Sequence, residues 1–241
     1  RETKTARGVA KLLSNATVPT RFGLLNAYVF QGQASQVQAD LSTEHMAWVV
    51  GKIHGKEEVP VRIHSECMTS EVFGSLKCDC KEQLDLALEE MVRQGGGVLI
   101  YLRQEGRGIG LAAKIQAYAL QTEGLDTIEA NLHQGLPSDA RIYDLAGDIL
   151  RQLGVRSINL MTNNPTKIEE LKKAGVRVCS ISSLLVPPNP YSKKYLSCKR
   201  TRMNHSLLTD TGWRRRGKGA GLDVGTSLRR TGSLGEKSTF P

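Results

Sequence analysis

The sequence has little cysteine, no long apolar run and no internal repeat. Five cysteines in 241 residues are too few, and odd in number, for the disulfide framework of a small secreted domain. No stretch approaches the ~20 apolar residues that a membrane-spanning helix needs, and we find no secretory signal at the start. We therefore expect a protein of a reducing compartment, most simply the cytoplasm, without a membrane partner.

Positive charge, by contrast, is in excess. The formal net charge of +9 predicts anionic partners such as a nucleotide, a nucleic acid or a phosphorylated metabolite. Part of the excess lies in residues 209–241, which contain "RRRGKG" and "LRR" together with many Gly and Ser. Because such a segment cannot bury enough apolar surface to offset the entropy lost on ordering, we expect a disordered basic tail there.

Hydrophobic periodicity predicts one mixed domain ahead of this tail. We expect residues 1–18 to form a flexible lead-in and residues 19–208 to form the domain. Strands are expected at 21–30, 45–53, 59–63, 97–102, 157–162 and 176–186. Helices are expected at 81–94, 111–124, 140–154, 163–175 and just before 208, with Ser138 or Asp139 as the cap of the third. This order predicts an α/β or α+β fold in which helices cover a mixed β-sheet.

Three of the five cysteines stand close together in "HSECMTSEVFGSLKCDC". Cys67 is followed by ten residues and then by Cys78 and Cys80, and a turn at Asp79 would bring the sulfurs around one metal ion. The spacing leaves open a catalytic zinc site with three protein ligands and a structural one with four, and inert thiols are a third alternative. The candidates for a fourth ligand are Cys179, Cys198 and His64.

A glycine-rich loop, "RQEGRGIG", follows the expected strand at 97–102 and precedes a helix. Backbone N–H groups at a helix N-terminus bind phosphate, and Arg103 and Arg107 add positive charge. Glu105 could bind a metal or the N–H edge of a base. The loop does not match the G-x-G-x-x-G or Walker pattern, so a tight turn with solvated arginines is the alternative. Taken alone, "LPSDARIYD" and "TNNPTK" are explained by helix capping.

Taken together, several segments resemble GTP cyclohydrolase II, the enzyme of the first committed step of riboflavin synthesis. The resemblance covers roughly Pro19 to Leu208. It rests on these segments in this order: "RIHSEC", "FGSLKCDC", "QL", "YLRQEGRGIGL", "KIQAYALQ", "DTIEAN", "DARIYDLAGDIL" and "LMTNNPTKIEEL". The family is often fused behind 3,4-dihydroxy-2-butanone-4-phosphate synthase, and the start at Arg1 without Met fits the carboxy-terminal part of such a fusion.

The resemblance implies a reaction with two chemistries. GTP and water would give formate, pyrophosphate and 2,5-diamino-6-ribosylamino-4(3H)-pyrimidinone 5′-phosphate. Zinc held by the three cysteines would activate a water for attack at guanine C8, and Tyr118 would orient or protonate the ring. Arg141 would act as the nucleophile at the α-phosphorus, or as a clamp for transition-state charge, with Asp139 as proton acceptor. Magnesium would bridge the triphosphate, and a homodimer is expected.

The resemblance also implies a set of GTP contacts. They are Arg62, Ile63, His64, Ser65, Glu66, Gln83, Glu105, Gly106, Arg107, Thr127, Thr162 and Lys167. This sequence departs from the family pattern at Ser70 and Lys81, where Gly is usual, and at Ile142, where Asp is common. None of these changes removes a proposed ligand or catalytic group.

Two alternatives to this function carry their own expectations. A related enzyme would stop at the formylated pyrimidine instead of releasing formate. A basic zinc-containing nucleic-acid-binding protein would also suit the charge, but the domain has no recognisable nucleic-acid-binding motif, so nucleic acid is an unlikely partner. In a photosynthetic eukaryote, the family would imply the plastid in place of the cytoplasm.

Overall fold

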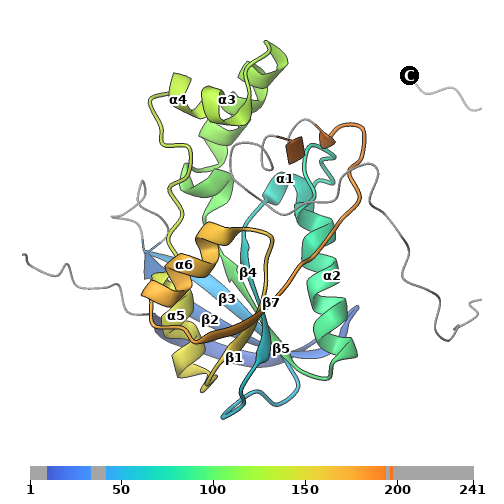
Figure 1. Ribbon diagram of the computed structural model, residues 1–241, viewed down its shortest axis with the longest axis vertical. Coiled ribbons are helices and arrows are strands. Elements are labelled where there is room, and N and C mark those ends of the chain that lie inside the picture. Colours follow the sequence, from blue (N-terminus) through green and yellow to red (C-terminus); the bar gives the residue numbers. More distant parts are fainter. Residues whose placement is uncertain (1–9, 34–41, 194–195, 198–241) are drawn as a thin grey trace, which may run out of the picture.

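One mixed sheet with helices on both of its faces forms the fold (Figure 1). The computed structural model describes residues 10–33, 42–193 and 196–197. The elements are β1 (Lys11–Thr20), β2 (Gly23–Gln33), β3 (Ser42–Val50), β4 (Val59–Ser65), α1 (Met68–Glu71), α2 (Cys80–Arg93), β5 (Gly97–Leu102), the 3₁₀ turn η1 (Glu105–Gly108), α3 (Leu111–Thr122), α4 (Thr127–His133), α5 (Asp144–Gln152), β6 (Ile158–Met161), α6 (Pro165–Lys173) and β7 (Val178–Ser182). The predicted fold class, a mixed β-sheet covered by helices, is confirmed.

The sheet is antiparallel on one side and parallel on the other. Its strand order is β1-β2-β3-β5-β4-β6-β7. The first four strands in this order pair antiparallel, and β5, β4, β6 and β7 pair parallel. The carboxyl ends of β4, β5 and β6 therefore lie along one edge, which is where open α/β sheets bind their ligands.

Alternation along β5 explains why helices cover both faces. Val98, Ile100 and Leu102 belong to a core cluster that includes residues of α5 and α6. Leu99 belongs to a second cluster, which includes residues of α2. Successive side chains of a strand point to opposite faces, so a continuous apolar run is what a strand buried on both faces requires. The helices α3 and α4 stand beyond the edge of the sheet (Figure 1).

Three element predictions need correction. The expected lead-in is too long, because Lys11–Thr20 forms β1, which pairs with β2 through a hairpin turn at Arg21 and Phe22. The short helix α4 was not predicted. The third helix was expected to open at Ser138 or Asp139, but α5 begins at Asp144, because the preceding residues make contacts at the site instead.

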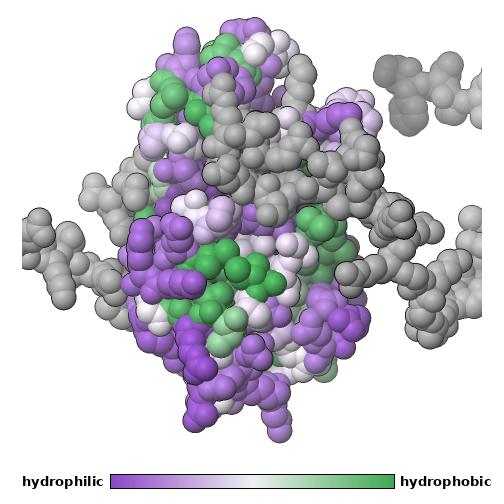
Figure 2. All heavy atoms as spheres, viewed as in Figure 1, coloured by the Kyte–Doolittle hydropathy of each residue, from purple (hydrophilic) through white to green (hydrophobic). Residues whose placement is uncertain are grey.

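Some predictions lie outside the described residues. They concern the first part of the lead-in, Cys198, the final short helix and the basic tail at 209–241. Within the described part of the chain, no helix combines the length and apolarity that crossing a membrane requires. Figure 2 shows mainly polar side chains on the face in view, with an apolar patch where β7 and α6 lie.

Candidate active site

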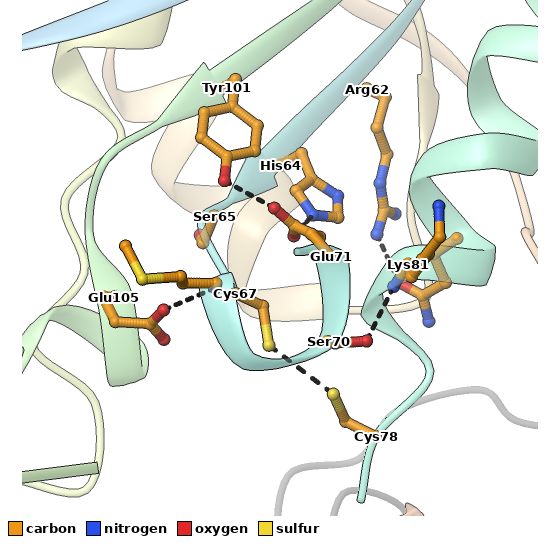
Figure 3. Close-up of polar contacts among 12 residues, drawn as sticks. Arg62, His64, Ser65, Cys67, Ser70, Glu71, Cys78, Lys81, Tyr101 and Glu105 are labelled. Carbon is orange, nitrogen blue, oxygen red and sulfur yellow. Dashed lines mark hydrogen bonds and ion pairs between the residues drawn. The ribbon is translucent and has the colours of Figure 1, made fainter. Parts of the chain in front are cut away.

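The predicted cysteine cluster forms at the carboxyl edge of the parallel strands. Cys67 follows the end of β4 and is the N-cap of α1, whereas Cys80 is the first residue of α2. The Sγ atoms of Cys67 and Cys78 are 3.6 Å apart (Figure 3). All three sulfurs lie within 4.8 Å of one another. Two sulfurs on one tetrahedral zinc ion would be ~3.8 Å apart, given Zn–S bonds of about 2.3 Å. The cluster could therefore hold a metal ion.

Two of the three candidates for a fourth ligand lie away from the cluster, and the third, Cys198, is outside the described residues. Among the residues that the structure describes, no other His, Cys, Asp or Glu joins the cluster. Cys179 is exposed on β7, and the His64 ring faces Glu71 instead. Three thiols with no fourth protein ligand among the described residues match the arrangement of a catalytic zinc site, in which one position stays open for water or substrate.

The three sulfurs of the cluster shift one another's pKa values. Hydrogen bonds from Cys78 and Cys80, together with the nearby Lys114 ammonium, hold the pKa of Cys67 far below its ordinary value. The hydrogen bond with Cys67 raises the pKa of Cys78, and both neighbouring sulfurs raise that of Cys80. A dication would stabilise all three sulfurs as thiolates, because thiolate is the form of cysteine that binds metal.

A buried polar chain holds the C-x-C turn from behind. Gln83 donates through Nε2 to Oδ2 of Asp79 at 2.5 Å, and its Oε1 accepts from Nη2 of Arg62. Arg62 also donates through Nη1 to the carbonyl of Met161 at 3.0 Å. Arg62 and Gln83 were both predicted to contact GTP. They are buried in this series of hydrogen-bonded residues and do not line the pocket described below. They fix the turn that carries Cys78 and Cys80.

The two departures from the family pattern near the cysteines contact each other. The Oγ of Ser70, in α1, accepts a hydrogen bond from the backbone N–H of Lys81 at 3.3 Å (Figure 3). Asp79, the N-cap of α2, makes no capping bond of its own, since its carboxylate is used by Gln83. Ser70 therefore supplies an acceptor to the first turn of α2 from another helix. The Lys81 ammonium pairs with Asp85 at 3.2 Å.

Replacing Ser70 with alanine is expected to lower the free energy of unfolding by about 1 kcal/mol, the usual contribution of such a cap. The partly buried Lys81 N–H would lose its acceptor, and the link between α1 and the C-x-C turn would loosen. Denaturant unfolding of metal-free protein measures the change. Ser75→Ala is the matched control, because Ser75 Oγ also accepts from a backbone N–H, that of Lys77, but in an exposed loop. Equal stability of Ser70→Ala and Ser75→Ala would show that Ser70 does not cap α2.

Glu105, at the start of the glycine-rich loop, is a buried anchor. Its Oε2 accepts from the backbone N–H of Met68 at 2.7 Å, and its Oε1 accepts from that of Gly106 at 2.7 Å (Figure 3). The same Oε1 accepts from Nζ of Lys114 at 2.6 Å. The carboxylate thus joins the loop to α1, next to Cys67, and Lys114 is a site residue that the sequence did not indicate.

The glycine-rich loop turns sharply at its centre. Gly106 and Arg107 both have φ in the left-handed region, 63° and 64°. Glycine adopts that conformation without cost, whereas Arg107 adopts it under strain. The carbonyl of Arg107 accepts from the backbone N–H of Ala140 at 2.9 Å, so the strained loop is tied to the segment before α5. The predicted loop is present, with a 3₁₀ turn inside it.

Tyr118, in α3, is linked to the cysteine cluster through Thr69 of α1. Its OH lies 3.4 Å from Oγ1 of Thr69, which in turn lies 3.8 Å from Sγ of Cys67. Burial raises the pKa of Tyr118 to about 12, although the Thr69 hydrogen bond acts in the opposite direction. The phenol therefore keeps its proton at neutral pH and is able to donate it.

Asp139 and Arg141 form an ion pair at the mouth of the site. Nε of Arg141 donates to Oδ1 of Asp139 at 2.8 Å, and Nη2 donates to Oδ2. Burial alone would raise the pKa of Asp139, but the Arg141 hydrogen bonds outweigh it and hold that pKa below its ordinary value. The fully buried Gln104 joins this segment to β4, because it donates to Ser65 Oγ at 2.9 Å and accepts from the Ile142 N–H at 3.2 Å. Ile142 therefore takes part in this contact through its backbone N–H and not through its side chain.

A buried histidine network supports α1 from the sheet. Oε1 of Glu71 lies 2.7 Å from Nε2 of His64, and Oε2 accepts from the OH of Tyr101 at 2.5 Å (Figure 3). Burial lowers the pKa of His64 in spite of the Glu71 hydrogen bond. This predicted GTP contact therefore serves, through its side chain, to anchor the helix that follows Cys67.

Other predicted GTP contacts lie behind the site. Ile63 is fully buried in the core, and its carbonyl accepts from Nζ of Lys167 at 2.8 Å. Thr162 Oγ1 accepts from the backbone N–H of Asn164 at 3.1 Å, and Asn164 is the N-cap of α6, as predicted from capping alone. The Lys167 ammonium lies 5.4 Å from the centroid of the Tyr143 ring, and the Arg141 guanidinium lies 6.0 Å from it.

A pocket opens at the cysteine cluster. Predicted site residues that line it are Ser65, Glu66, Cys67, Cys78, Cys80, Glu105, Gly106, Arg107, Tyr118, Thr127 and Arg141. Residues that the sequence did not indicate also line it, namely Lys77, Ile109, Lys114, Ala117, Gln121 and Asn131. Burial raises the pKa of Glu66, despite the positive charge of Arg103 3.7 Å away. The pocket thus joins a possible metal centre to a loop and an arginine suited to phosphate.

Known proteins resemble this chain over the whole sheet and the pocket. A family model described as GTP cyclohydrolase II matches residues 11–182. A GTP cyclohydrolase-2 of Picrophilus torridus is 47% identical over 192 residues, which cover 80% of this chain and 96% of that protein. A GTP cyclohydrolase-2 of Actinobacillus succinogenes is 46% identical over 196 residues, covering 81% and 88%. The riboflavin biosynthesis protein RibBA of Salinispora arenicola is 46% identical over 201 residues, covering 83% of this chain and 46% of that protein.

Proposed function

The chain belongs to the GTP cyclohydrolase II family, and on that premise we propose how its pocket divides the reaction between a zinc end and a phosphate end. The chain is an enzyme, a hydrolase of GTP in riboflavin biosynthesis. The products would be formate, pyrophosphate and 2,5-diamino-6-ribosylamino-4(3H)-pyrimidinone 5′-phosphate. One water is consumed in opening the ring, one in releasing formate and one in releasing pyrophosphate.

The observation that carries this proposal is the position of the three thiols within one pocket. Cys67, Cys78 and Cys80 line it together with Gly106 and Arg141. Zinc bound by the three sulfurs would act as a Lewis acid that lowers the pKa of a water to about 7. Guanine C8 and the α-phosphorus belong to the same GTP molecule, so one pocket with a metal end and a cationic end suits both.

At the metal end, the chain supplies a proton donor and acceptors for the base. Tyr118, with a pKa of about 12, keeps its proton and would donate it to a ring nitrogen as the C8–N bond breaks. The Glu66 carboxylate would accept from guanine N1–H and the exocyclic amine. Glu105 is held by Met68, Gly106 and Lys114, so we assign it to holding the loop rather than to the base.

At the phosphate end, Arg141 would stabilise charge on the α-phosphoryl group. Arginine is protonated at neutral pH, and the Arg141 guanidinium donates to the Asp139 carboxylate beside it. A guanidinium that is held by a carboxylate is already oriented before the substrate binds, which suits a clamp for transition-state charge. We therefore favour the clamp over the nucleophilic role, and we assign Asp139 to orienting Arg141. Arg107 would bind the outer phosphates.

The remaining family features complete the proposal. Magnesium would bridge the triphosphate oxygens, since it is commonly bound through substrate phosphates. The enzyme would act as a homodimer in a reducing compartment, the cytoplasm or a plastid, where three free thiols remain available to a metal. The layer that supports the phosphate end from behind would consist of Thr162, Lys167 and the carbonyl of Ile63.

Metal removal tests the zinc assignment. Purified protein is expected to hold about one zinc per chain, as a three-thiolate site would. Chelator-treated protein should release no formate from GTP, and one equivalent of zinc should restore the release. Unchanged formate release by protein shown to be free of metal would rule out the zinc role.

A further inference from the structure

A buried lysine contacts the cysteine cluster from α3. Nζ of Lys114 lies 3.1 Å from Sγ of Cys67 and 2.6 Å from Oε1 of Glu105. The Lys114 side chain is 11% exposed, and lysine is seldom buried to this degree unless its ammonium is paired. Both of its partners are anionic groups at the proposed metal end, so Lys114 belongs to the site, although only Tyr118 was given a role within the segment "KIQAYALQ".

The geometry holds this ammonium in place. The Glu105 carboxylate that it contacts is itself fixed by the backbone N–H groups of Met68 and Gly106. Met68 directly follows Cys67, so sulfur, ammonium and carboxylate close a ring of contacts with the backbone. The fold therefore holds the Lys114 ammonium at the Cys67 sulfur, so this contact does not require a flexible side chain to become ordered.

In the metal-loaded enzyme, the net charge of the zinc–thiolate site would make the contact between Lys114 and Cys67 important. Three thiolates and one zinc ion leave a net charge of −1, and three thiolates make zinc a weaker Lewis acid than three neutral imidazoles do. A hydrogen bond from an ammonium draws electron density from a thiolate and so reduces what the sulfur donates to the metal. Groups beyond the direct ligands commonly tune metal sites in this way.

We propose that Lys114 is a positioning residue that donates a hydrogen bond to the Cys67 thiolate of the loaded site and thereby increases the Lewis acidity of the metal. This inference rests on the proposed function, since it requires metal at the three cysteines. A purely structural role, in which Lys114 only neutralises buried Glu105, makes a different prediction. It would alter stability but leave the electronic properties of the metal–sulfur bonds unchanged.

Cobalt substitution separates these roles. In the Co²⁺ enzyme, thiolate-to-metal charge transfer absorbs in the near ultraviolet, and its energy rises when a hydrogen bond stabilises the sulfur lone pair. Lys114→Met removes the donor at similar length, so its charge-transfer band is expected at longer wavelength than the wild-type band. Zinc affinity, measured by chelator competition, is expected to fall about 10- to 100-fold, because the buried site with a net charge of −1 would lose the ammonium that compensates it.

Lys77→Met is the matched control. Lys77 lines the same pocket, and its ammonium lies 4.7 Å from the Tyr118 ring centroid, compared with 5.9 Å for Lys114. Its variant should keep the wild-type charge-transfer band. Lys114→Arg retains a charged donor and should stay nearer to the wild type than Lys114→Met. If Lys114→Met does not fold, Lys114→Gln provides the same comparison with an uncharged side chain.

The outcomes distinguish this inference from the proposed function. Wild-type protein that takes up Co²⁺ without a thiolate charge-transfer band would overturn the proposed metal site itself. A normal wild-type band that is unchanged in Lys114→Met, with unchanged zinc affinity, would leave the metal site intact and overturn the role of Lys114.

Discussion

Replacing Cys78 with serine is expected to lower formate release from GTP by about 10³-fold or more. Cys78 Sγ lies 3.6 Å from Cys67 Sγ, within a cluster that has no fourth protein ligand among the described residues. A serine hydroxyl is a poorer zinc ligand than a thiolate, so the site would lose both metal affinity and Lewis acidity. Metal-assisted activation contributes several kcal/mol, and each 1.36 kcal/mol corresponds to about a tenfold change in rate.

The same variant separates the two ends of the pocket. Pyrophosphate release, which we assign to the Arg141 end, should fall less than formate release. Cys179→Ser is the control, because Cys179 is an exposed free thiol on β7 and should tolerate the change without loss of either product. Undiminished formate release by Cys78→Ser, in protein of confirmed sequence, would remove zinc from the ring-opening step.

Replacing Arg141 with alanine is expected to slow pyrophosphate release by about 10²- to 10³-fold, the usual effect of losing one donor to transition-state charge. The Asp139 carboxylate would also lose the partner that now holds its pKa below the ordinary value. A carboxylate without its guanidinium partner would then remain where we propose that the α-phosphate binds. Single-turnover measurement of pyrophosphate gives the rate. Arg177→Ala, which alters an exposed ion pair with Glu57, is the control and should leave the rate unchanged.

Intact-mass spectrometry of quenched enzyme distinguishes the clamp from the nucleophile. A clamp forms no bond to phosphorus, so the wild-type chain should keep its mass during turnover. A transient gain in mass equal to a guanylyl group, absent from Arg141→Ala, would contradict the clamp and establish the nucleophilic role.

The cysteine cluster was predictable because its signal is local. Cys67, Cys78 and Cys80 are chemically distinctive residues at close spacing, and a helix start lies where the two sulfurs must converge. The strand Gly97–Leu102 was equally clear, since an apolar run bounded by glycine is typical of a strand with both faces buried. In both cases a few neighbouring residues decide the structure.

The supporting residues were not predictable, because their roles come from distant contacts. Lys114 and Gln104 lie in segments that carry the resemblance, but neither had an indicated role there. They meet Cys67, Ser65 and Ile142 only because β4 pairs with β5. Nothing in the local pattern indicates that pairing.

Helix α4 was missed for a different reason, since a local signal was present. Asp126 and Glu129 form a capping box, which marks the start of a helix in the sequence. The helix is only 7 residues long, so apolar periodicity has little room to appear. The late start of α5 is the opposite case, in which Asp139 resembles a cap but its carboxylate pairs with Arg141.

The fate of guanine C8 tests the proposed reaction most directly. GTP labelled with ¹³C at C8 is incubated with zinc-loaded enzyme and magnesium, and the products are followed by ¹³C NMR and mass spectrometry. We expect the label to appear in free formate, with pyrophosphate and an unlabelled diaminopyrimidinone monophosphate formed alongside it. Label that stays in an intact purine or in a formylated pyrimidine, without free formate, would contradict the proposed reaction.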